Sequence, residues 1–135
     1  MLLAGILSCA LIAALFLFNG QSPRSIAGDF MSALCKGDAD TVAGLSYVPG
    51  KSKEQLRKEW ADAMGDGKAY LFSWDIQGVD LATNDSAVVN LKITTNPNDP
   101  EQEPEARPLT LIKDKGAWKV DLSQLSREAF PYLPR

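Results

Sequence analysis

The hydrophobic pattern divides the chain after its first twenty residues. Residues 1–20 contain no Asp, Glu, Lys or Arg, and residues 1–18 form an apolar run. As a helix this run would be about 27 Å long, close to the roughly 30 Å core of a bilayer. It is apolar on every side, whereas a buried helix of a soluble domain is usually amphipathic. We predict a transmembrane anchor in residues 1–20 and a separate domain in residues 21–135.

A secretory signal peptide is the second interpretation of the same segment. Such a signal has a basic start and a small-x-small cleavage site. The start of this chain has no Lys or Arg, and the bulky Phe18 is the third residue before a cut after Gly20. The pattern therefore favours an uncleaved anchor.

The first part of the domain has the 3.6-residue period of helices. Apolar positions in residues 26–35 follow this period, and Pro23 suits the first helical position because its missing N–H has no partner there. Polar caps and glycines mark the ends of three such segments. The predicted helices begin at Ser22–Pro23, Asp38 and Ser52, and end at Gly37, before Pro49, and at Gly65–Gly67.

After Gly67 the period changes to two, which is typical of half-buried strands. The alternating runs centre on residues 70–81, 89–94, 109–111 and 118–122. Gly78 is a candidate β-bulge, Pro108 should lie at an edge or strand start, and Asp114–Gly116 should form a hairpin turn. Short turns favour antiparallel strands with the helices on one face. The predicted fold class is α+β, with three helices followed by an antiparallel sheet of about four strands.

The amino-acid composition excludes several classes of functional site. The 135 residues contain 14 Lys plus Arg, 17 Asp plus Glu, no His and two Cys, with a net charge of −3. Mild acidity argues against a nucleic-acid partner, which needs a basic surface. Without His, neither a His-based triad nor a His metal site can form, and two Cys exclude a disulfide framework or a four-thiolate zinc site. We predict no cofactor and no metal.

Two segments of the sequence resemble those of the nuclear transport factor 2-like (NTF2-like) superfamily. The first is a helix opened by Ser22–Pro23 that contains Phe30 and Leu34 and ends in Lys-Gly-Asp at 36–38; the second is the closing hairpin KDKGAWKVD at 113–121. The resemblance implies a curved sheet wrapped round helices into a cone with a concave pocket, and pairing of domains through the sheet. The most similar members are small bacterial lipoproteins or membrane-anchored proteins of unassigned function. They imply a single-pass protein whose domain lies on the extracytoplasmic (periplasmic) side.

Some members of this superfamily are isomerases or dehydratases, so catalytic residues must be considered. Their chemistry uses a His with a carboxylate, or an Asp base with a Tyr and a protonated Asp. This chain has no His, Tyr47 lies in a segment bounded by Gly and Pro, and the parity of Asp75 and Asp121 points both outward. We predict that the protein is not an enzyme and has no catalytic residues.

Two groups of residues are candidate binding sites. Trp60, Phe72, Trp74 and Trp118, together with Tyr70, could line a pocket for a small apolar ligand, but the favoured interpretation is that they fill the core. The segment 96–105 carries three prolines and the four carboxylates of Asp99, Glu101, Glu103 and Glu105. It lacks the spaced pattern of a calcium loop. It is either a solvated connection or a stiffened loop that binds a basic partner.

These features predict a non-enzymatic interaction module on a membrane anchor at residues 1–18. Such a module would be a small accessory subunit of a larger membrane complex, or a homodimer through its sheet. Gly5, Ser8 and Ala10 would allow close helix packing in the membrane. The alternative is an extracytoplasmic carrier or sensor that binds a small apolar ligand in the cone.

Overall fold

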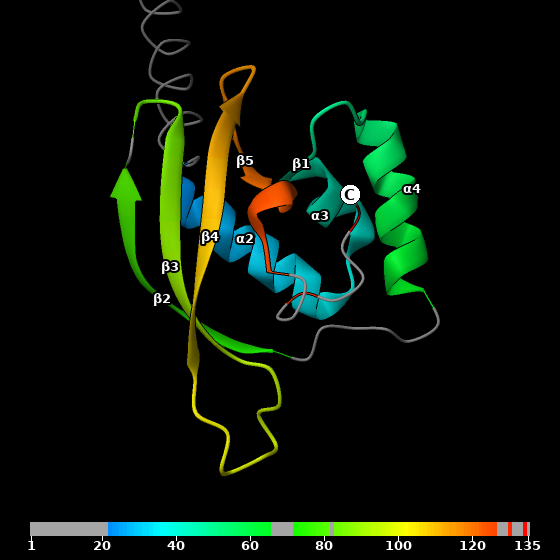
Figure 1. Cartoon of the computed structure of the whole chain (residues 1–135). Helices are drawn as coiled ribbons and strands as arrows, with labels where there is room; N and C mark the ends of the chain where they lie inside the picture. Colours follow the sequence, from blue (N-terminus) through cyan, green and yellow to red (C-terminus); the bar gives the residue numbers. More distant parts are fainter. Residues whose placement is uncertain (1–21, 66–71, 82, 127–129, 131–133, 135) are drawn as a thin grey trace, which may run out of the picture.

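The computed structural model of the chain describes residues 22–65, 72–81, 83–126, 130 and 134. The predicted anchor in residues 1–20 lies outside these residues, and so does Tyr70. Among the described residues, no helix is long and apolar enough to span a bilayer. The described elements are helices α2 (Pro23–Lys36), α3 (Ala39–Gly44) and α4 (Lys53–Met64), strands β1 (Ser46–Tyr47), β2 (Ser73–Leu81), β3 (Ser86–Thr94), β4 (Glu105–Asp114) and β5 (Ala117–Asp121), and the 3-10 helix η1 (Leu122–Gln124) (Figure 1).

The three helices begin where the polar caps predict. The Ser22 hydroxyl accepts a hydrogen bond from the Ser25 N–H at 3.1 Å, and the Ser52 hydroxyl accepts one from Gln55 N–H at 3.2 Å. Each bond satisfies an N–H that has no partner within its own helix. Helix α2 ends at Gly37 in the left-handed conformation, with φ of 73°. The predicted capping chemistry is confirmed at both helices.

The sheet has five strands in the order β1-β5-β4-β3-β2, so the prediction of about four strands was one too few. Strand β1 is parallel to β5, and the other neighbours are antiparallel. In β1, Ser46 pairs with Val120 and Tyr47 with Asp121. Two residues are too short to show a period, so this strand exists only because β5 is folded beside it.

The finer predictions for the strands have mixed outcomes. The register of β2 on β3 shifts at Gly78, which confirms the bulge. Pro108 lies within β4 and not at its start. It pairs with Asn90 of β3, in a part of β4 that is not paired with β5. The turn between β4 and β5 has positive φ at Lys115 and Gly116, as in a tight two-residue hairpin. Leu81 is 68% exposed at the end of the edge strand.

The core lies between helix α2 and the concave face of the curved sheet, with α3 and α4 beyond (Figure 1). Strand β3 shows the predicted alternation: Val89, Leu91 and Ile93 are buried, while Lys92 is exposed. Every buried side-chain nitrogen or oxygen of the described residues has a hydrogen-bond partner. The largest fully buried side chains are Trp60, Phe30, Phe130, Met31, Leu34, Leu91, Ile93, Leu109, Leu111 and Leu122.

Candidate functional site

Two of the four aromatic residues of the candidate pocket are part of close ring contacts. Trp60 is fully buried in α4; its ring meets that of Phe30 edge-on at 6.3 Å between centroids, and its indole N–H donates to the Ser46 hydroxyl at 3.1 Å. Phe72, before β2, meets Phe130 edge-on at 5.6 Å. Such contacts are ordinary core packing with the polar atom satisfied.

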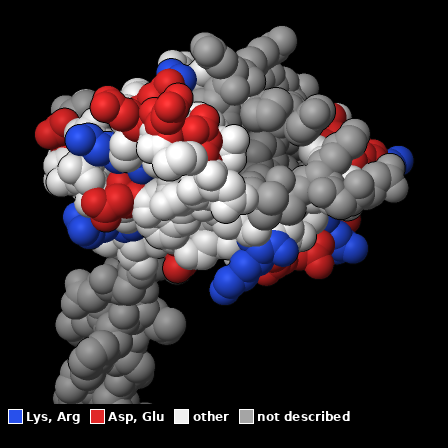
Figure 2. All heavy atoms as spheres, turned by 90° about the horizontal axis from the view of Figure 1, so that it is seen from below, with Lys and Arg blue, Asp and Glu red and all other residues white. Residues whose placement is uncertain are grey.

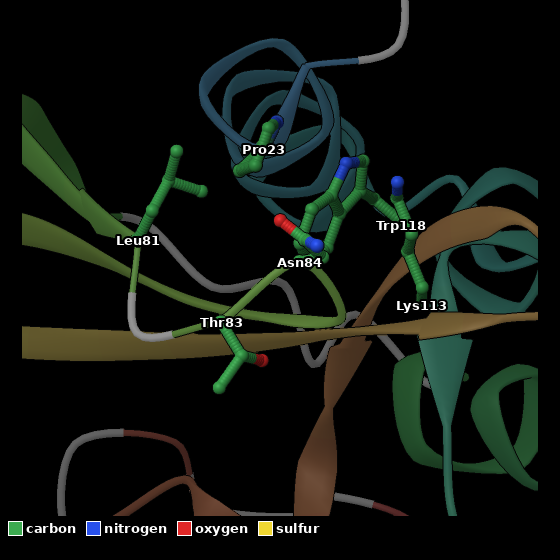
Figure 3. Close-up of a pocket in the computed structure, with 6 residues that line it drawn as sticks. All are labelled: Pro23, Leu81, Thr83, Asn84, Lys113 and Trp118. Carbon is green, nitrogen blue, oxygen red and sulfur yellow. The ribbon is translucent and has the colours of Figure 1, made fainter.

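Trp74 and Trp118 line separate hollows. Trp74 is half-buried and borders a shallow hollow of about 150 Å³ over β2 and β3. Trp118 in β5 borders a larger, open hollow of about 710 Å³, whose described lining is Pro23, Leu81, Thr83, Asn84, Lys113 and Trp118 (Figure 3). The structure therefore places the four aromatic residues in different surroundings. Trp74 lines one of these two hollows and Trp118 lines the other.

The larger hollow contains residues that the sequence reasoning did not single out. Lys113 continues the inner-face parity of Leu109 and Leu111 on β4, but at the end of the strand, where the core no longer covers it. Its ammonium lies 5.2 Å from the centroid of the Trp118 ring, within the range of a cation–π contact. The alternation of β4 could have identified Lys113, because a Lys in an inward register marks an opening.

The candidate catalytic residues have structural partners. Asp75 is exposed and accepts a hydrogen bond from the Gln77 amide at 2.7 Å. The Asp121 carboxylate accepts bonds from the backbone N–H and the hydroxyl of Ser123, at 3.1 and 2.6 Å, and so caps η1. Tyr47 is the register neighbour of Asp121, on the sheet face opposite to the buried Val120. Asp121 therefore has a capping role that accounts for its position.

Two half-buried groups have shifted acidities. Burial lowers the pKa of Lys119, the nearby charge of Lys53 lowers it further, and Asp114 raises it; the Lys119 ammonium donates to the carbonyl of Gly44. Burial raises the pKa of the Cys35 thiol, which lies 3.8 Å from the carbonyl oxygen of Phe72. Cys35 is half-buried. A raised thiol pKa keeps the sulfur protonated and unreactive.

The acidic loop between β3 and β4 is held by its own side chains. Gln102 accepts a hydrogen bond from the Asn96 N–H at 2.5 Å and donates to the Thr95 hydroxyl at 3.1 Å. The Asp99 carboxylate accepts from the Glu101 N–H at 3.0 Å. Gln102 thus spans the base of the loop, a role that no sequence pattern indicated.

The four carboxylates of the candidate partner loop are all exposed. They belong to Asp99, Glu101, Glu103 and Glu105, and the last forms an ion pair with Arg107 at 2.5 Å. Figure 2 views the molecule from below Figure 1, the end where this loop lies, and shows acidic side chains gathered on part of that face. The described residues contain no group of three or more Cys, Asp and Glu side chains placed to hold a metal ion.

Comparison with known proteins identifies the fold. No family model and no curated protein matches the chain. A protein named as an NTF2-like transpeptidase from Campylobacter jejuni aligns with a TM-score of 0.53 and 17% identity, over 75% of this chain and 98% of that one. A domain of unknown function with a cystatin-like fold from Nostoc punctiforme gives 0.50 and 11%, over 72% and 69%. A ketosteroid isomerase-like protein from Erwinia carotovora gives 0.46 and 18%, over 72% and 86%.

These likenesses concern the fold alone. Three helices and a curved five-stranded sheet, four of whose strands follow the helices in the chain, fit the arrangement of an NTF2-like cone, as the sequence resemblance implied. At such low identity no activity is transferred, because one fold serves many functions. The fold therefore neither assigns catalysis to this chain nor excludes it.

Proposed function

We propose that this chain is a non-enzymatic interaction module, anchored in a membrane by residues 1–18, that serves as an accessory subunit of a larger membrane complex. Its domain lies on the extracytoplasmic side. The observation that carries the proposal is the position of the acidic loop, at the opposite end of the sheet from Pro23. The apolar segment joins the domain immediately before Pro23, so the loop is directed away from the membrane.

The sheet topology supports this opposition of ends. Strand β3 runs from Ser86 to Thr94 and β4 returns antiparallel to it, so the 95–104 loop and the 83–85 turn lie at opposite ends of β3. Nine extended residues separate these ends by roughly 27–30 Å. Pro23 lines the same hollow as Thr83 and Asn84, which places the start of α2 at the turn end. A partner that the loop reaches therefore lies well beyond the bilayer surface.

The construction of the loop also suits recognition of a protein. The two bonds of Gln102 and the Asp99 bond hold the loop in one shape before any partner arrives, and its prolines restrict the backbone further. Less conformational entropy is then lost on docking. The carboxylates of Asp99, Glu101 and Glu103 are exposed, so the surface they present fits a basic partner.

The absence of catalysis is part of the proposal, and three observations support it. The chain contains no His. The Asp121 carboxylate is used as a cap for η1, and Asp75 is exposed on the sheet. Trp60 fills the core and lines neither of the two hollows described above. An isomerase-type site needs a carboxylate and a hydroxyl group converging in an apolar cavity.

A carrier or sensor of a small apolar ligand is the second candidate. The open hollow beside Trp118, about 710 Å³ in volume, favours it. The polar members of the lining, Thr83, Asn84 and Lys113, weaken it, because an apolar ligand would leave their polar groups unpaired. Binding of apolar probes that changes Trp118 fluorescence, with no protein partner recovered, would favour this candidate.

Co-purification from the native membrane tests the proposal. The full chain is extracted in mild detergent, its native size is measured, and retained proteins are identified. A matched pair of variants localises the contact: Asp99→Asn, Glu101→Gln and Glu103→Gln in the loop, against Asp29→Asn, Glu54→Gln and Asp62→Asn, which remove the same charge from exposed helix positions. We expect a partner that is retained by the wild type and the helix variant, and lost from the loop variant.

Several outcomes would contradict the proposal. A lone monomer in mild detergent would argue against an accessory subunit, and a species containing only two copies of the chain would replace it with a homodimer. Release of the intact chain by alkaline carbonate would refute the anchor. N-terminal sequencing that starts after Gly20 would identify residues 1–20 as a cleaved signal.

A further inference from the structure

We infer that the turn end of the domain rests on an anionic lipid surface, with phospholipid headgroups entering the hollow beside Trp118. This inference rests on the anchor of the proposed function and adds the contact between domain and bilayer. The turn end consists of the start of α2, the 83–85 turn and the hairpin at Lys115–Gly116. Figure 3 shows Leu81 on one side of the hollow, Lys113 and Trp118 on the other, and Pro23 of α2 above them.

Hydrogen bonds connect the turns at the turn end of the domain. The Lys113 N–H donates to the carbonyl of Asp85 at 2.8 Å, so the two turns are joined by a backbone bond. Within the first turn, the Thr83 N–H donates to the Ser86 carbonyl at 3.2 Å, and the Thr83 hydroxyl accepts from the Asp85 N–H at 3.2 Å. These bonds connect the two turns that border the hollow.

The position of the anchor requires this end to lie near the bilayer. Only residues 19–22 separate the apolar run from Pro23, so five Cα–Cα steps join Phe18 to Pro23, and they can span at most about 18 Å. The headgroup region of one leaflet is itself about 5–8 Å thick. A domain joined so closely to the bilayer core cannot keep Pro23, and with it the hollow, far from the headgroups.

The chemistry of the hollow fits a phospholipid surface better than water or a neutral ligand. Leu81 is 68% exposed and is the only large hydrophobic side chain so exposed among the described residues. An exposed aliphatic side chain with a nearby cation is typical of surfaces that lie at the headgroup boundary. Lys113 is the one charged residue in the described lining, which also includes the amide side chain of Asn84. An ammonium and a neutral amide donor suit a lipid phosphate.

The charges around the hollow set the orientation. The cations of this end are Arg24, Lys113 and Lys115, and its carboxylates are those of Asp80, Asp85 and Asp114, so the formal charges cancel. The carboxylate of Asp80, next to Leu81, accepts a hydrogen bond from the Asn90 side chain at 2.9 Å. This end is therefore neutral overall, with Lys113 as the one charged residue in the hollow, whereas the opposite loop is strongly acidic. An anionic bilayer repels the acidic loop and so favours the orientation with the turn end toward the membrane.

Site-specific fluorescent labels in the reconstituted full chain test the inference. Cys9→Ala and Cys35→Ala remove the native thiols, and an environment-sensitive label is attached at Leu81→Cys or, as the matched control, at Glu101→Cys. Both positions are exposed, so neither label disturbs the core. The vesicles are either phosphatidylcholine alone or an equal mixture of phosphatidylcholine and phosphatidylglycerol. Quenching is measured with a headgroup nitroxide lipid and with aqueous iodide.

In the anionic vesicles we expect the label at position 81 to be quenched by the nitroxide and protected from iodide, and the label at position 101 to behave in the opposite way. Lys113→Gln should make the quenching of the label at position 81 the same in anionic and in neutral vesicles. Lys58→Gln, which removes an exposed cation on α4, should preserve the difference in quenching between the two kinds of vesicle. Equal iodide access at positions 81 and 101 in a chain that resists carbonate extraction would overturn this inference and leave the anchor intact. Release by carbonate would overturn both.

Discussion

The two ends of the sheet are built by different means, although each connects antiparallel neighbours. At the turn end, β4 and β5 are joined by two residues in positive φ, and the backbone of Lys113 is bonded to Asp85. At the loop end, ten residues join β3 to β4, and the side chain of Gln102 holds them together. The turn end is therefore coupled to the core through its backbone. At the loop end, surface side chains can be substituted with little loss in the free energy of unfolding.

The largest expected difference concerns the two tryptophans that border the two hollows. Trp118→Ala should lower the free energy of unfolding by about 3–4 kcal/mol, because the side chain is 8% exposed and also contacts Lys113. Trp74→Ala, in a half-buried position on the edge strand, should cost about 1–2 kcal/mol. Denaturant unfolding of the full chain in mild detergent measures both. Equal losses would contradict the stronger coupling of the turn end to the core.

A smaller effect is expected at the tight turn. Gly116 has φ of 82°, where a Cβ is unfavourable, so Gly116→Ala should cost about 1–2 kcal/mol. Gly116→Asn is the matched control, because Asn tolerates this conformation and should cost less. No atom lies within 4 Å of the Cβ position, so backbone strain alone is tested. If both variants unfold at the wild-type denaturant concentration, the turn does not depend on this conformation.

The loop should respond locally and not globally. Gln102→Ala removes the acceptor for the Asn96 N–H and the donor to Thr95, and an opening free energy lowered by about 1 kcal/mol should speed hydrogen exchange at Asn96 roughly five-fold. Gln102→Glu keeps the acceptor and should give an intermediate rate. Global unfolding should change by less than about 0.5 kcal/mol in either variant. A large global loss from Gln102→Ala would show that the loop is part of the core.

The smallest effect is expected from the loop charges. Glu101→Gln with Glu103→Gln should change the free energy of unfolding by less than about 0.5 kcal/mol, because both side chains are exposed. Glu59→Gln provides the contrast: its carboxylate receives the Lys51 ammonium at 2.7 Å in a half-buried pair, and its loss should cost about 1 kcal/mol. If the loop variant were the less stable of the two, its carboxylates would have a structural role and not one in recognition alone.

Local features of the fold were predictable because their causes lie close together in the sequence. Ser22 caps α2 through a residue three positions away, Gly37 ends it by its own conformation, and the parity of β3 follows from neighbouring side chains. The same holds for the bulge at Gly78. These features follow from the covalent geometry of short segments, so a single sequence contains the information.

Other features depend on residues that meet only in the folded chain. Strand β1 forms because Ser46 pairs with Val120, which lies 74 positions later in the sequence. Leu81 is exposed because β2 is an edge strand. The candidate four-residue aromatic pocket rested on residue type, whereas neighbours such as Phe30 and Phe130 give two of those rings their surroundings. Residue type and parity predict which side chains turn inward. Which of them then share a hollow is decided by sheet order and helix packing, because contacts between distant segments have no counterpart in local spacing.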